Sequence, residues 1–113
     1  SRRSQEREAE AMLAAARSRK ESATNQALAE LSQSLSALEA ARRTETTIAN
    51  SLLPQAELTY QSALASYQNG KLDFATLLDS QRQIRQAKQS QIKVQADGQA
   101  RLADIERLLG EEL

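Results

Sequence analysis

The chain has 113 residues, and its 15 Lys and Arg balance its 15 Asp and Glu, so the formal net charge is zero. A nucleic-acid-binding surface usually shows a basic excess, so this balance argues against a nucleic-acid partner. The chain has no His and no Cys, which removes the usual nucleophile–base pairs and the soft metal ligands, so we expect no enzyme activity, no metal site and no cofactor.

The apolar content is mostly Ala and Leu, with one Phe, two Tyr and no Trp. One Pro and three Gly leave few places to break a helix. This composition is typical of long, narrow helices with a thin apolar seam, so we expect an all-α fold. No apolar run approaches the roughly 20 residues of a membrane helix. The chain begins at Ser1 without Met, and we expect it to be a piece of a larger protein.

The segment from about residue 4 to 67 predicts one long helix, because it contains no Gly and a single Pro. Its apolar residues recur in steps of three and four, which is a heptad pattern. Strict continuation would bury Arg42 and Glu45, so we expect the stripe to drift in register. The expected seam passes through Leu28, Leu31, Leu35, Leu38, Ala41, Ile48 and Leu52.

Pro54 interrupts this helix. A proline inside a helix costs about 3 kcal/mol and usually kinks it. The helical spacing resumes at once with Ala56, Tyr60 and Ala63, so we expect a kink near residue 54. The alternative is that Pro54 lies at the first position of a new helix, which would divide the chain into three helices.

A tight turn is predicted over residues 68–73. Gly70 suits the left-handed conformation just after a helix end, and Asp73 is a good N-cap for the next helix. With Asp73 as the cap, Leu72 and Leu77 occupy the two positions of a hydrophobic staple. Both sides of the turn therefore favour a helical hairpin.

The second helix is expected from residue 74 to about 109. Gly98 weakens its interior by about 1 kcal/mol without ending it. Gly110 is expected to end the helix. The expected seam of this helix begins with Phe74, Leu77, Ile84 and Ala87 and ends with Leu102, Ile105 and Leu109.

The two arms differ in length. At 1.5 Å per residue the first would span about 95–100 Å and the second about 55–60 Å. Residues 4–27 would therefore find no partner within the hairpin. On the exposed faces, ion pairs at i,i+4 spacing are expected between Glu39 and Arg43 and between Asp97 and Arg101.

Four motifs follow one another along the chain: Leu53-Pro54-Gln55-Ala56, Tyr67-Gln68-Asn69-Gly70, Phe74 with Leu77-Leu78-Asp79, and Leu108-Leu109-Gly110. In this order they resemble outer membrane efflux proteins of the TolC family, and most of all the branch that serves heavy-metal resistance-nodulation-division (RND) pumps. The opening Arg2-Arg3 and the Glu and Ala residues of 5–16 resemble the start of the family's last long periplasmic helix. The similarity covers essentially the whole chain, but only the C-terminal part of a complete family member.

The resemblance implies a role in export. Family members are homotrimers with an outer-membrane β-barrel and a long α-helical tunnel through the periplasm, to which each protomer gives two helical hairpins. This chain resembles the second hairpin, which implies a periplasmic part of an outer-membrane protein. Its turn would lie at the periplasmic tip, where the tunnel is closed at rest and opens on meeting the adaptor (membrane fusion) protein and the inner-membrane RND pump. The exported substrates would be metal ions or drugs.

The resemblance assigns the gate and the adaptor-docking surface to the turn. Tyr67 matches the family's tip tyrosine, whose polar contacts hold the tunnel shut, and Gly70 matches the tip glycine. The family archetype has an arginine two residues after that glycine, where this chain has Leu72, and Lys71 is the nearby cation. The expected tip residues are Tyr67, Gln68, Asn69, Gly70, Lys71, Leu72 and Asp73.

Two other classes of protein fit the same pattern. The α-hairpin of a periplasmic adaptor protein has a similar composition, but β segments of the lipoyl type should flank it. A free-standing coiled-coil scaffold needs no specificity at its tip, and Tyr67 would then only cover the seam. Cut from the trimer that the family resemblance implies, the isolated chain would expose seams meant for its neighbours, so we expect it to self-associate.

Overall fold

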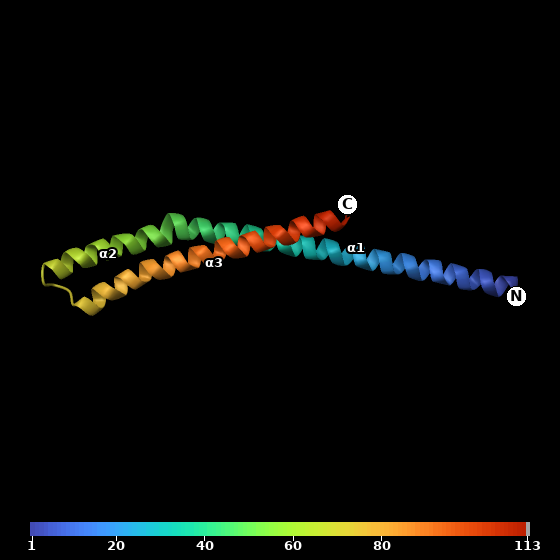
Figure 1. The fold of residues 1–113 in the computed structure, drawn as a ribbon, viewed down its shortest axis with the longest axis horizontal. Coiled ribbons are helices and arrows are strands. Elements are labelled where there is room, and N and C mark those ends of the chain that lie inside the picture. The colour runs from blue at the N-terminus through green and yellow to red at the C-terminus, as the bar shows by residue number, and fades with distance from the viewer. Residues whose placement is uncertain (113) are drawn as a thin grey trace.

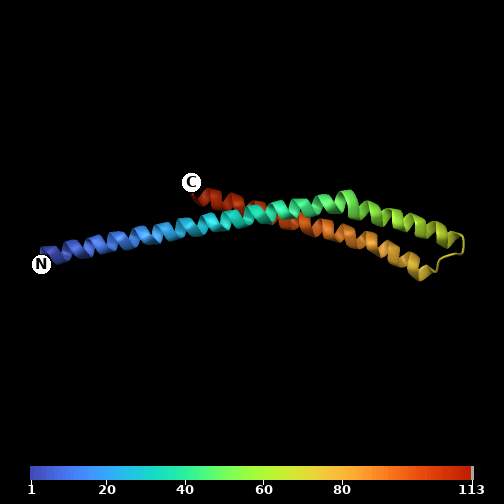
Figure 2. The same cartoon turned by 180° about the vertical axis from the view of Figure 1, so that it is seen from behind.

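The computed structural model describes residues 1–112, which form two helical arms joined by one turn. The first arm consists of α1 (Arg2–Thr47), the π-helical segment η1 (Ile48–Leu52) and α2 (Leu53–Gln68), and the second arm is α3 (Phe74–Glu112). The arms lie antiparallel and cross once along their length (Figures 1 and 2). The molecule measures 98 × 22 × 14 Å. The all-α antiparallel hairpin with unequal arms is therefore confirmed.

The first arm extends far beyond the second at its N-terminal end (Figure 1). Residues 1–26 are all exposed, and Ala27 is the first half-buried residue. The helix begins after Ser1, whose Oγ accepts a hydrogen bond of 3.3 Å from the backbone N–H of Ser4. This cap satisfies one of the free amides at the helix start. Residues 1–26 thus pack on no other described part of the chain.

The seam of α1 against α3 follows a heptad, but its phase differs from the predicted one. Leu28 and Leu35 are 55% and 44% exposed, whereas Ser34 is buried. The prediction of Leu28 and Leu35 as seam residues is therefore wrong. Counting back toward the N-terminus from the buried Ile48 in alternating steps of three and four residues leads to Ser34 and not to Leu35. The contacts near Ile48 therefore decide which residues of α1 face α3. The buried and half-buried residues of the seam on α1 are Ala27, Leu31, Ser34, Leu38, Ala41, Glu45 and Ile48, and the half-buried Ala37 lies beside this seam.

The first arm changes its helical type just before Pro54. The backbone N–H of Leu53 donates to the carbonyl of Ile48, five residues earlier, which is the π-helical pattern. The arm continues as α2 without a reversal, and it changes direction in this region in both views (Figures 1 and 2). Leu52, which was predicted to lie in the seam, is 48% exposed, and Leu53 is half-buried instead. The added residue of the π turn moves Leu52 away from α3.

The second arm also departs from the prediction at its two ends. Phe74 is 59% exposed and Leu109 is 46% exposed, whereas Leu108 is buried. Phe74 is the first residue of α3. Gly110 does not end the helix, because α3 continues through it to Glu112. Gly110 does not adopt a positive φ, so it provides no C-terminal stop.

The two predicted ion pairs are absent from the part of the chain that the structure describes. Pairs within 4.0 Å form instead between Arg2 and Glu6 at 3.7 Å and between Arg107 and Glu111 at 3.2 Å, both at i,i+4 spacing. Exposed pairs gain little free energy in water, so sequence spacing alone does not decide which of them form. Over residues 1–112, no helix contains an apolar stretch long enough to cross a lipid bilayer.

Candidate interaction site at the hairpin turn

The turn begins with a complete Schellman motif at the end of α2. The backbone N–H of Lys71 donates to the carbonyl of Ser66 at 2.8 Å, and that of Gly70 donates to the carbonyl of Tyr67 at 3.0 Å. Gly70 adopts φ 71°, the only positive φ among the described residues. The left-handed conformation costs an L-residue with a Cβ about 1–2 kcal/mol, which explains why glycine stands here.

The turn ends with an N-cap on α3. The Oδ1 of Asp73 accepts a hydrogen bond of 3.1 Å from the backbone N–H of Thr76. Interaction with the Thr76 side chain, and then this backbone bond, lower the pKa of the Asp73 carboxyl below its ordinary value of 3.8. Leu72 is half-buried and Leu77 is buried on either side of the cap. Both helix ends that meet in the turn are therefore held by their own local chemistry.

Two aromatic rings bridge the arms at the tip. The ring centroids of Tyr67, in the last turn of α2, and Phe74, the first residue of α3, lie 5.9 Å apart at an interplanar angle of 58°. This tilted arrangement is favourable for aromatic pairs. Both residues are exposed to solvent, with 41% of the surface of Tyr67 and 59% of that of Phe74 accessible. They form a small apolar surface at an otherwise polar end.

The other predicted tip residues divide by exposure. Gln68, Asn69 and Lys71 are exposed, and Leu72 is half-buried. None of their side chains makes a hydrogen bond or ion pair within the described chain. A groove of about 220 Å³ runs from the turn between α2 and α3, and its walls are formed by Thr59, Ser62, Ala63, Ser66, Leu72, Thr76, Asp79, Ser80 and Gln83.

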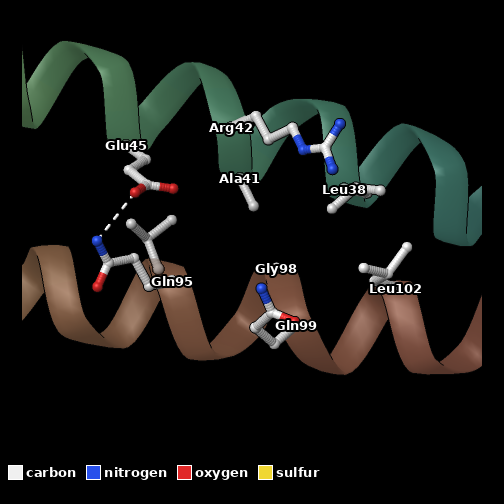
Figure 3. Close-up of a pocket in the computed structure, with 9 residues that line it drawn as sticks. Leu38, Ala41, Arg42, Glu45, Gln95, Gly98, Gln99 and Leu102 are labelled. Carbon is white, nitrogen blue, oxygen red and sulfur yellow. Dashed lines mark hydrogen bonds between the residues drawn. The ribbon is translucent and has the colours of Figure 1, made fainter.

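A second groove lies at the middle of the hairpin, where α1 crosses α3 (Figure 3). Here the Nε2 of Gln95 donates to the Oε1 of Glu45 at 2.9 Å, a hydrogen bond between the arms. Gly98 faces Ala41 and Leu38 one turn further along. Glu45 and Gln95, which make the polar bond, also line the groove. This groove is a packing feature with a polar edge.

The chemistry available in these grooves is that of hydroxyl, amide and carboxylate groups. The Oγ of Ser80, beside the turn, donates to the carbonyl of Leu77 at 2.6 Å, so its proton is engaged in the helix. Among residues 1–111, no group of three or more Asp and Glu side chains converges in a way that could hold a metal ion.

Sequence reasoning located the turn and its two capping residues, but it missed three features. Phe74 was assigned to the seam, although its position seven residues after Tyr67 across a tight turn could have indicated the aromatic pair. The contact of Glu45 with Gln95 was missed because Glu45 was expected to avoid the seam. The π turn carried a weaker signal, the change of heptad phase before Pro54.

Comparisons with protein-family models, with curated proteins and with solved structures found no match to this chain.

Proposed function

We propose that this chain is the periplasmic helical hairpin of an outer membrane efflux channel of the TolC family. In this role the arms form part of the wall of an export duct, and the turn is both its tip gate and its docking segment. The channel works with a periplasmic adaptor protein and an inner-membrane RND pump to export metal ions or drugs. It is a homotrimer, and the hairpin is the periplasmic part of this outer-membrane protein.

The observation that carries the proposal is the surplus of exposed side chains at the turn. Folding the turn needs the left-handed Gly70 and the Asp73 cap. Gln68, Asn69 and Lys71 are exposed and contribute only backbone to the turn. Their side chains are therefore free to contact a partner. Their order around Gly70 is also the part of the sequence that resembles the family's tip.

Exposed apolar side chains along the arms support a multisubunit wall. Residues with more than two fifths of their surface exposed occur on α1, on α2 and on α3, so neighbours on more than one side are needed to cover them. We expect the isolated chain to self-associate. A strictly monomeric mass at high concentration in analytical ultracentrifugation would contradict this. Besides Tyr67 and Phe74 at the tip, the residues are Met12, Leu13, Leu28, Leu35, Leu52, Leu58, Ile92 and Leu109.

Gating requires two packings of the tip with different affinity for the partner. The Tyr67–Phe74 ring pair is one contact that a separation of the arms would break, because its two rings come from different arms. The gate cannot use the archetype's arginine, because Leu72 occupies that position and is half-buried. Lys71 is exposed and carries the positive charge of the turn.

Export from cells tests the proposal, with two glycine variants of the natural protein that contains this chain. Gly70→Ala strains the turn, whereas Gly98→Ala places the same methyl group in open packing space in the middle of the hairpin. We expect Gly70→Ala to lower substrate export while the protein level and trimer content stay normal. Gly98→Ala should export normally. Normal export by Gly70→Ala would show that export does not need the conformation of the turn, and it would favour the free-standing coiled-coil scaffold.

A further inference from the structure

The spacing of inward-facing residues on the first arm changes once. From Ala27 to Ile48 the steps alternate between four and three residues. The next inward-facing residue is Leu53, five residues after Ile48, and the alternation then resumes through Ala56 and Tyr60. The interval from Ile48 to Ala56 is therefore eight residues, where a heptad seam takes seven.

The facing arm has no matching change. On α3 the buried and half-buried residues Ala87, Gln91, Val94 and Gly98 keep the steps of four, three and four. This helix is α-helical across the whole region. The first arm thus carries one residue more than the seam has room for. Such an insertion in one strand of a coiled coil must be absorbed by a local change in winding.

The π-helical turn absorbs this residue. In η1 the chain uses the bond from the Leu53 N–H to the Ile48 carbonyl, which places one more residue in the turn than an α-helix does. Residues 49–52 are exposed, while Ile48 before them is buried and Leu53 after them is half-buried. The extra residue is therefore turned outward, and both flanking seams keep their contact with α3.

Pro54 is compatible with the wide turn and does not by itself require it. In a regular α-helix a proline at this position would clash with the carbonyl of Asn50 and would leave that carbonyl without a donor. Many prolines in helices produce a kink within α-helical geometry. Threonine hydroxyls just upstream favour bending as well: those of Thr46 and Thr47 donate to the carbonyls of Arg42 and Arg43 at 3.0 and 3.1 Å.

We propose that Ile48–Leu52 is a register joint, which the phase of the seam requires and at which the tip half of the hairpin pivots against the base half. The base half is the seam up to Ile48, and the tip half is the seam from Leu53 to the turn. Four of the five residues of the joint, 49–52, are exposed, and Ile48 is its only buried residue. Local opening therefore begins there. This proposal holds whether or not the chain belongs to an efflux channel.

The test separates the phase of the seam from the proline. Three variants of the whole chain are needed: Pro54→Ala, Pro54→Ala with Ser51 deleted, and Pro54→Ala with Ser22 deleted as the matched control. Ser51 is exposed and makes only a 3.4 Å contact with the side chain of Gln55. Ser22 lies in the unpaired stretch of α1, where deletion alters no seam.

Crystal structures of these variants give the decisive result. Pro54→Ala should keep the bond from Leu53 to Ile48, with Leu53 facing α3. The Ser51 deletion should give an uninterrupted α-helix with the same seam toward the tip, and the Ser22 deletion should keep the π turn. A regular α-helix in Pro54→Ala, with Leu52 turned inward, would overturn the proposal. The proposal would also be overturned if the Ser51 deletion kept the π turn or separated the arms.

Hydrogen exchange tests the pivot in solution. The backbone amides of residues 49–53 should exchange at least ten times faster in Pro54→Ala than the corresponding amides of the Ser51 deletion, with unchanged rates near Leu38. Equal rates in the two variants would contradict a pivot at this point. The comparison holds the proline constant, so it reports on the extra residue alone.

Discussion

Gly98 on α3 lies directly against Ala41 on α1, with room for one methyl group. A Cβ at position 98 would lie 3.9 Å from the Cβ of Ala41 and 3.9 Å from the Cδ1 of Leu38, both ordinary van der Waals distances. Gly98 is therefore not required for the helices to approach. It weakens α3 without a packing reason.

Gly98→Ala should stabilise the hairpin by about 0.5–1 kcal/mol, because alanine loses less backbone entropy in a helix and fills the available space. Thermal unfolding followed by circular dichroism at a fixed protein concentration checks this. Gly98→Leu is the control, since its longer side chain exceeds the space and should lower the midpoint. A lower midpoint for Gly98→Ala would show that the arms cannot accept the methyl group.

Gly70→Ala should destabilise the hairpin by about 1–2 kcal/mol, because the residue must keep a left-handed conformation in the Schellman motif. No atom would obstruct the new Cβ, so the cost is purely conformational. Gly70→Asn should lower the free energy of unfolding less than Gly70→Ala does, since asparagine tolerates this conformation. Urea unfolding measures both changes. Equal losses for the two variants would indicate a steric cause.

The Asp73 cap gives the hairpin a pH dependence. The pKa of this carboxyl is lowered in the folded state from 3.8, so the unfolded chain binds more protons as the pH falls. Its contribution to stability is thus full above pH 3.8 and is lost as the pH falls through the folded-state pKa. The stability difference between the natural chain and Asp73→Ala should shrink over this interval. Asp73→Asn, an uncharged cap, should show no such titration, and a constant difference for Asp73→Ala would contradict the cap.

The hydrogen bond from Gln95 to Glu45 should couple the two arms. A double-mutant cycle with Glu45→Ala and Gln95→Ala should give a coupling free energy of about 0.5–1 kcal/mol, because the bond is partly open to water. A double-mutant cycle between Glu45 and the distant Gln83 is the control and should give no coupling free energy. If the losses of stability in Glu45→Ala and Gln95→Ala simply add in the double mutant, the hydrogen bond does not persist in solution.

Local signals in the sequence were enough to predict the turn. Gly70 and Asp73 act on backbone groups within a few residues, so their effect hardly depends on the rest of the fold. The heptad phase was harder to predict, because Leu28 and Leu35 fit the spacing as well as Ala27 and Ser34 do. Only the long run of contacts with α3 decides between them.

Features that depend on both arms at once were beyond the sequence pattern. Phe74 packs on Tyr67 because the turn brings residues of the two arms together. The π turn reflects a mismatch between the two seams, of which the first arm alone gives only a weak signal, the change of heptad phase before Pro54.

The efflux-channel assignment is tested most directly by photo-cross-linking from Asn69, an exposed turn residue, in cells that make the natural protein containing this chain. The same cross-linker in place of Ser22, far from the turn, is the control. The assignment predicts that the product from Asn69, identified by mass spectrometry, contains a periplasmic adaptor protein and that the Ser22 product does not. Capture at Asn69 of only the protein itself or of cytoplasmic proteins, at normal expression, would contradict it and leave a scaffold.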